Sequence, residues 1–317
     1  MNVSENENPK TLEELITMAE SLRGAALLRL SPEAIERKVR AVASSAPVIG
    51  TQQKQRSIWY RGRICETAEG WDNIRECIYH QRPNEIHHYG RANYPHEAVF
   101  YASWNLFTVL SELQPRPGQF VQIIGARTQK GRALMSHAIG EYTHVFNSGT
   151  SQINEPTLAH AINTEIGAQP TELVYKSLYF DAFMAEQFSQ RTKKPHEHML
   201  TAAYARLMFS TNAAVIYPSV ESPAAMNIAV PTSIFDQDFE VLFTEVFLVK
   251  SYCGYSLWQL ERTKATCEFH EDMAVWDSTK TLPRSHGAIG DVIYSADIVG
   301  WCVLPHSGAG SSGGPVA

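Results

Sequence analysis

The sequence has no long apolar run and no leader-like start. Eighteen consecutive apolar residues occur nowhere in the 317-residue chain, so we expect no membrane-spanning helix. The first ten residues, MNVSENENPK, lack the basic and apolar regions of a signal peptide. Hydrophobic residues make up 44% of the chain and charged residues 19%, which is typical of soluble globular proteins. We therefore expect a cytoplasmic protein with a sizeable core and no membrane partner.

Cysteine is scarce, and acidic residues outnumber basic ones. An odd number of scattered cysteines without a CxxC pair favours reduced thiols over disulfides or a zinc site. The net charge of −6 argues against a nucleic-acid partner, which normally requires a basic surface. The five cysteines are Cys65, Cys77, Cys253, Cys267 and Cys302.

Several common catalytic and ligand-binding motifs are also missing. The chain contains no GxSxG, the usual esterase motif. The histidines of His87-His88 and His196-Glu197-His198 do not have the HExxH spacing of zinc proteases, so solvated loops are the better interpretation. The C-terminal GAGSSGG lacks the lysine of a phosphate-binding loop and indicates a linker. We expect neither a metal ion nor a required cofactor.

Residues 89–112, YGRANYPHEAVFYASWNLFTVLSE, combine a turn, a strand and a helix. The glycine and proline at the start predict the turn, and the apolar run at 98–102 predicts a buried strand. Ser103 is expected to cap a helix over residues 104–113, on which Glu112 lies away from the apolar face. A solvated helix face is the ordinary interpretation of Glu112. A site is the alternative, because side chains converge where a strand leads into a helix.

Short motifs in a fixed order resemble the RES-domain family, which is named for a characteristic Arg, Glu and Ser. The family pattern has an early Tyr-Arg, then Gly-Arg-aromatic-Asn, a strand with Tyr-Ala-Ser, a Glu late in the next helix, and a later Tyr-Pro-Ser followed by Asn-x-Ala. The chain departs from this pattern at Ala92, where the family usually has an aromatic residue. The matching motifs, over roughly residues 58–235, are Tyr60-Arg61, Gly90-Arg91-Ala92-Asn93, Tyr101-Ala102-Ser103, Glu112, Tyr217-Pro218-Ser219 and Asn227-Ile228-Ala229.

This resemblance implies a fold, an activity and a set of site residues. Family members are typically bacterial toxins that destroy NAD, and their fold is related to that of ADP-ribosyltransferases. Such toxicity implies an antitoxin or another regulatory protein as a partner. The implied catalytic residues are Arg61, Glu112 and Ser219, and the implied substrate-binding residues are Tyr60, Arg91, Asn93 and Tyr101.

Arg61 lies in an apolar strand predicted at 58–65, where a charge is costly unless it is paired or bound to an anion. A salt bridge, for example with Glu66, and a clamp on the pyrophosphate of NAD both fit that position. Arg91, in the turn, is the second candidate for the phosphates. Tyr101 is expected to stack on nicotinamide, and an ordinary core aromatic is the alternative.

Glu112 is the residue expected to carry the chemistry. Breaking the nicotinamide–ribose bond develops positive charge on the ribose, which a carboxylate stabilises, and nicotinamide leaves without protonation. A third group, a hydroxyl, is expected from Ser219 at the end of a buried strand at 213–217, although a plain turn residue is the strong alternative. Thr201 is the other source considered, but a helical Thr often bonds back to its own turn.

The predicted elements give an α+β fold with a mixed or antiparallel sheet core and flanking helices; the resemblance adds an ADP-ribosyltransferase-like cleft. A capping box at 11–14 and a Ser-Pro helix start at 31–32 predict a helical N-terminal extension over residues 1–50, for docking, homo-oligomerisation or bracing. Residues 51–306 are expected to form the NAD-cleaving domain, and residues 307–317 a flexible tail. Further expectations are a strand at 120–126, helices at 156–167, 177–192 and 198–209, an antiparallel pair at 239–249 and 255–260, and a loop at 75–88.

The leading function is cleavage of NAD by a glycohydrolase or phosphorylase, with water or phosphate as the acceptor of the ribosyl group. NAD is then a substrate and not a cofactor. One alternative is ADP-ribosyl transfer to a protein or nucleic acid. The other is a non-catalytic domain that binds a nucleotide or a partner.

Overall fold

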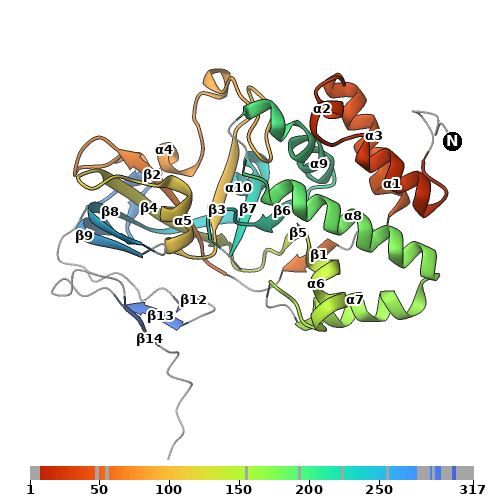
Figure 1. The fold of residues 1–317 in the computed structure, drawn as a ribbon. Coiled ribbons are helices and arrows are strands. Elements are labelled where there is room, and N and C mark those ends of the chain that lie inside the picture. Colours follow the sequence, from red (N-terminus) through yellow and green to blue (C-terminus); the bar gives the residue numbers. More distant parts are fainter. Residues whose placement is uncertain are drawn as a thin grey trace, which may run out of the picture. The chain divides into compact units, whose positions relative to one another are not determined.

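The computed structural model describes residues 8–46, 50–53, 57–153, 156–191, 194–222, 225–254 and 257–276, with three short strands further on (Figure 1). The chain divides into two compact units. Unit 1 contains residues 1–55, 79–103 and 128–239, and unit 2 contains residues 56–78, 104–127 and 240–317. No helix in the described part of the chain is long and apolar enough to cross a membrane. The tail expected at 307–317 lies outside the described residues.

Unit 1 contains a mixed run of strands. Their order is β1-β5-β6-β7-β3, in which β5 and β6 are parallel and the other neighbours are antiparallel. The sequence signals for β3 and β6 are confirmed, whereas β7 was not predicted as a strand. The expected α+β class with a mixed sheet is also confirmed. The strands are β1 (Gly50–Gln53), β3 (Val99–Ser103), β5 (Leu134–Ala138), β6 (Ala214–Pro218) and β7 (Met226–Pro231).

The first helices form as their caps predict. In α1 (Leu12–Glu20), Thr11 and Glu14 make a reciprocal capping box, and in α3 (Pro32–Ser45) the Ser31 hydroxyl accepts the N–H of Ala34. A single turn, α2 (Gly24–Leu27), lies between them.

These N-terminal helices share a core with the rest of unit 1. Helix α1 packs on α8 (Thr171–Ser189), and α3 packs on α9 (Met199–Phe209), as Figure 1 shows for the red and green helices. Leu15 and Ile35 are fully buried in the same hydrophobic core as Phe180 and Tyr204. Residues 1–55 therefore belong with residues 79–103 and 128–239 and do not form a compact body of their own.

The rest of unit 1 is helical. The segment at 133–147, which alternates in polarity, forms β5 and then a helix that begins after Gly140, whose φ of 83° suits glycine. The helix expected at 177–192 begins earlier, at Thr171, and ends at Ser189. The additional elements are η1 (Pro83–Glu85), α6 (Glu141–Ser148), α7 (Pro156–Ala168), η2 (Pro195–His198) and α10 (Thr232–Asp238).

Unit 2 is built on a second run of strands in the order β2-β4-β8-β9. The pairs β2–β4 and β8–β9 are antiparallel, which confirms the predicted closing pair. The unit contains β2 (Trp59–Cys65), α4 (Arg75–Ile78), α5 (Leu106–Leu113), β4 (Phe120–Thr128, with its last residue in unit 1), β8 (Phe239–Gly254, with its first residue in unit 1), β9 (Leu257–Thr266), β10 (Phe269–His270), β11 (Met273–Ala274), β12 (His286–Gly287), β13 (Gly290–Ile293) and β14 (Cys302–Leu304).

Helix α5 packs tightly on strand β2. A Cβ atom at Gly62 would lie only 2.7 Å from side-chain atoms of Ile123 and Val109, and 2.8 Å from Leu113. Only a residue without a side chain lets the helix approach this closely. Because side chains alternate along a strand, the neighbours of Gly62 in β2 point to the opposite face, away from α5.

Two local predictions in this region were wrong. Ser103 is the last residue of β3, paired with Asn227 of β7, and the helix cap is Asn105, whose side chain accepts the N–H of Thr108. Pairing with β7 extends the strand beyond the point where capping propensity would end it. The segment at 75–88, expected to be a loop, contains α4 and η1.

Candidate functional site

The predicted site residues fall into both units. The turn and strand of residues 89–103 belong to unit 1, and the helix that follows belongs to unit 2. Unit 1 contains Arg91, Asn93, Tyr101, Thr201 and Ser219. Unit 2 contains Tyr60, Arg61 and Glu112.

Tyr101 and Asn93 are joined directly. The Tyr101 hydroxyl donates to Asn93 Oδ1 at 2.8 Å and accepts the N–H of Ala92, also at 2.8 Å. Gly90 completes the turn, since its N–H binds the Asn93 carbonyl and a Cβ there would lie 2.2 Å from Asn93 Oδ1. Tyr101 therefore holds the Gly-Arg-Ala-Asn turn in place, and its hydroxyl proton is used there.

Arg91 binds the end of a helix. Its guanidinium donates to the carbonyl of Phe188 at 2.6 Å and to that of Gln190 at 3.2 and 3.3 Å. These carbonyls belong to the last turn and the cap of α8, where a positive charge stabilises the helix. The observed role of Arg91 is thus to fasten the motif turn to α8.

Thr201 and Ser219 also make local hydrogen bonds. The Thr201 hydroxyl is buried and donates to the carbonyl of His198 in its own turn, as helical threonines often do. The Ser219 hydroxyl accepts the N–H groups of Glu221 and Ser222 in the turn between β6 and β7. Both contacts match the structural alternatives, and the catalytic role of Ser219 stays a prediction.

A buried pair links the motif strand to its neighbour. Ser103 donates to Asn227 Oδ1 at 2.5 Å, and the two residues face each other across the β3–β7 ladder. Both belong to the motifs that carry the family resemblance. Neither residue was predicted to belong to a site, although their motif positions were the available signal.

Arg61 points away from the helix that carries Glu112. Its Nε donates to the carbonyl of Cys77 at 2.8 Å, at the end of α4. Since α5 packs over Gly62, alternation places Arg61 on the other face of β2. Tyr60, by contrast, is buried in the core with Phe243, at 6.1 Å between ring centroids.

Glu112 is exposed near the end of α5. Helix α5 covers the face of β2 on which Gly62 lies, whereas Arg61 lies on the other face of that strand. The carboxylate is accessible, and its role in the chemistry stays a prediction.

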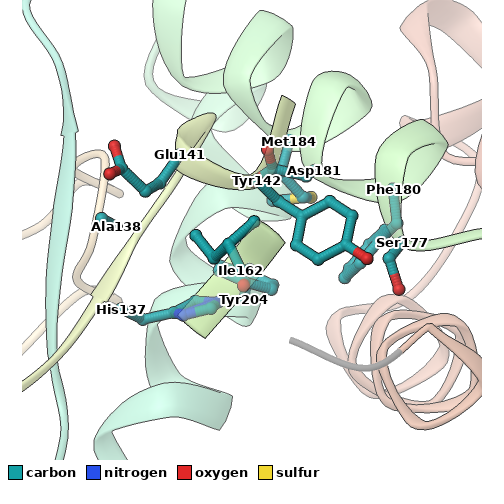
Figure 2. Close-up of a pocket in the computed structure, with 10 residues that line it drawn as sticks. All are labelled: His137, Ala138, Glu141, Tyr142, Ile162, Ser177, Phe180, Asp181, Met184 and Tyr204. Carbon is teal, nitrogen blue, oxygen red and sulfur yellow. The ribbon is translucent and has the colours of Figure 1, made fainter. Parts of the chain in front are cut away.

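A cavity that the sequence did not reveal lies within unit 1. Its volume is about 20 Å³, room for about one water molecule. Figure 2 shows the rings of His137 and Tyr204 beside each other, with centroids 5.9 Å apart, while the Glu141 carboxylate points away from them. The lining comes from β5, α6, α7, α8 and α9, so no local pattern could have indicated it. The lining residues are His137, Ala138, Glu141, Tyr142, Ile162, Ser177, Phe180, Asp181, Met184 and Tyr204.

Both acidic side chains that line this cavity, Asp181 and Glu141, accept hydrogen bonds from backbone N–H groups. Asp181 accepts the N–H groups of Gly140 and Thr143, each at 2.8 Å, and so caps the start of α6. Desolvation raises the pKa of Asp181, although these hydrogen bonds act in the opposite direction. Desolvation also raises the pKa of Glu141, whose Oε2 accepts the N–H of Gln152. No group of three potential ligands in the described part of the chain could hold a metal ion.

His137 is expected to make stability depend on pH. Burial lowers its pKa to about 4, below the ordinary value near 6.5, so the unfolded chain binds the proton more tightly. Its contribution is therefore fully present above pH 6.5 and is lost as the pH falls towards 4. Between pH 7 and pH 5 this one group should cost about 2 kcal/mol of unfolding free energy.

Urea unfolding of a His137→Gln variant at both pH values checks this expectation. The variant should lose about 2 kcal/mol less than the wild type on acidification, whatever its stability at pH 7. His160→Gln, at an exposed position of α7, is the matched control and should keep the wild-type difference. An unchanged pH difference in His137→Gln would contradict the assignment. The pKa of His198 is also lowered to about 4, by desolvation and then by Arg91, so part of the acid sensitivity should persist.

Comparison of the chain with protein-family models, with curated proteins and with solved structures finds no match. The resemblance to the RES-domain family therefore rests on the motif residues alone and stays a prediction.

Proposed function

We propose that this protein cleaves NAD at the nicotinamide–ribose bond. The observation that carries the proposal is the exposed carboxylate of Glu112, on the helix that directly follows the Tyr-Ala-Ser strand in sequence. In the proposed reaction Glu112 stabilises the oxocarbenium-like ribose as neutral nicotinamide departs. Water or phosphate then takes the ribosyl group, which yields ADP-ribose or its phosphorylated equivalent. An ADP-ribosyltransferase-like cleft for the substrate is part of the proposal.

Arg61 and Arg91 are the two arginines expected to bind the phosphates of NAD. Its side chain lies on the face of β2 opposite to α5, and Arg91 is bound to α8. Both arginines therefore have a structural contact, and Glu112 is the residue on which the chemistry depends.

A second candidate is a domain that binds a nucleotide or a partner without turnover. The observation in its favour is that Arg91, Tyr101, Thr201 and Ser219 all make hydrogen bonds that hold local structure. In such a domain the motif residues would maintain the fold and would take no part in catalysis. Transfer of ADP-ribose to a macromolecule remains the alternative within the catalytic class. As for partners, an antitoxin is implied by the resemblance, and a homo-oligomer would have to use side chains other than the buried apolar faces of α1 and α3.

Incubating the purified chain with NAD, with and without phosphate, tests the proposal directly. We expect release of nicotinamide, detected by mass, together with a small-molecule ADP-ribose product whose mass identifies the acceptor. NAD labelled in its adenosine part, supplied with cell extract, shows whether the label instead enters protein or nucleic acid. Intact NAD under all these conditions would favour the non-catalytic domain.

A further inference from the structure

Two histidines lie on opposite sides of the Gly-Arg-Ala-Asn turn in unit 1. The turn is closed by an isolated antiparallel bridge between Gly90 and Asn93. His87 and His96 are each three positions outside this bridge, and their ring centroids are 5.6 Å apart. Residues at equal distances from an antiparallel turn lie opposite each other, so the turn itself brings the two imidazoles together. The opposed pairs are Gly90–Asn93, Tyr89–Tyr94 and His87–His96.

His96 has a backbone conformation that is uncommon for a residue with a side chain. Its φ is 64°, in the left-handed region, where a residue other than glycine is strained. The backbone N–H of His96 donates to the carbonyl of Ile86 at 2.7 Å, which helps to hold this conformation. Strained residues persist where the surrounding structure fixes them, and they are concentrated at binding and catalytic sites.

A second hydrogen bond fixes the state of the His96 ring. Its Nδ1 lies 3.2 Å from the carbonyl oxygen of Asn84, in the single turn η1. Because a carbonyl oxygen only accepts, Nδ1 carries the proton in this bond, and in the neutral ring Nε2 then keeps its lone pair. Histidines that bind metal ions usually donate their other ring N–H to a carbonyl or carboxylate in this way. Nε2 of His96 is therefore the nitrogen that can bind a metal ion.

We propose that His87 and His96 form a binding site for a zinc ion, with water as the remaining ligands. Neutral imidazole is a preferred zinc ligand. Two imidazoles on one tetrahedral zinc, at the usual zinc–nitrogen distance of about 2.0–2.1 Å, have centroids roughly 5 Å apart, close to the 5.6 Å observed. Both side chains are exposed, so an ion and its water ligands can reach them. The bound ion would join the segments before and after the turn that contains Arg91 and Asn93.

This site has two protein ligands, so it is smaller than the three-ligand groups that the described part of the chain lacks. It does not depend on the proposed cleavage of NAD, because Glu112 belongs to unit 2.

Calorimetric titration of the intact chain with zinc chloride tests the site. His87→Gln removes one of the two ligands and should weaken zinc binding about tenfold or more, since even the partners of a metal ligand contribute roughly 10–100-fold. His96→Asn should have the same effect, and asparagine is chosen because it tolerates a positive φ. The matched controls are His160→Gln, at an exposed position of α7, and Cys253→Ser, at an exposed thiol, and both should bind zinc as the wild type does.

Thermal melts with and without zinc give a second measurement and verify folding. Zinc should raise the melting temperature of the wild type and of both controls, because an ion that binds the folded chain stabilises it, but not that of His87→Gln or His96→Asn. Magnesium, which prefers oxygen ligands, should have no such effect. Absence of zinc binding in the wild type, or wild-type affinity in a folded His87→Gln variant, would overturn the proposal. Glu112→Gln should keep zinc binding, so failure of the NAD reaction and failure of this site give different results.

Discussion

Replacing Glu112 with glutamine is expected to lower nicotinamide release from NAD by roughly a hundredfold or more. Glutamine has nearly the same shape but carries no charge, so it cannot stabilise the positive ribose of the transition state. The melting temperature should stay close to that of the wild type, because the side chain is exposed on α5 and surface changes usually have small effects. Single-turnover kinetics with NAD in excess over its dissociation constant would report the chemical step.

Two further variants sharpen this prediction. Glu112→Asp keeps the charge but moves it by one methylene, so its rate should lie between those of the wild type and Glu112→Gln. Glu66→Gln makes the identical change at an exposed site in the same unit and should keep full activity. Near-normal turnover by a folded Glu112→Gln protein would remove Glu112 from the mechanism. Equal losses in Glu112→Gln and Glu66→Gln would point to a general effect of charge.

Replacing Leu15 with alanine is expected to lower the unfolding free energy by about 2–5 kcal/mol. Leu15 is fully buried in α1, within the core that also contains Phe180 and Phe183 of α8. The truncation leaves a cavity that this packed interior cannot fully close. Leu28→Ala, where the side chain is 53% exposed, should change stability by no more than about 0.5 kcal/mol. Urea unfolding followed by circular dichroism measures both.

Deletion of the N-terminal helices tests the same core packing with a larger change. Deleting residues 1–46 removes Leu15, Ile35 and Val39 from the core and exposes their partners on α8 and α9 to water. We expect this chain to be unfolded or aggregated. A truncated chain with wild-type stability would mean that the N-terminal helices are a separable extension.

The sequence correctly predicted the elements that are determined by caps and apolar runs within the element itself. The Thr11 capping box and the Ser31 cap gave the positions of α1 and α3, and apolar runs gave β2, β3 and β4. The wrong predictions concern elements whose limits depend on residues far away in the sequence. Strand β3 extends through Ser103 because Asn227 pairs with it from 124 residues away. The single turn α4 ends at carbonyls that accept hydrogen bonds from Arg61 and Arg63 in β2, which no local pattern indicates.

In the candidate site, too, the sequence does not indicate contacts between residues that are far apart in the chain. The bond between Tyr101 and Asn93 spans only eight residues, and the motifs named both as site residues, although the bond itself was not predicted. The contact of Arg91 with Phe188 spans 97 residues, and no residue near Arg91 in the sequence indicates that it binds the end of a helix. The cavity around His137 draws on five elements and is a property of tertiary packing alone.

The interleaving of the two units has a consequence for biosynthesis. The chain passes from one unit to the other after residues 55, 78, 103, 127 and 239, so neither unit is a continuous segment. During translation, β2 and β4 emerge long before β8, the strand beside β4, has been made. Apolar strand edges of this kind pair with other chains when they stay uncovered. Folding should therefore be slow, and chaperones should help to protect the β4 edge until β8, in the last quarter of the chain, leaves the ribosome.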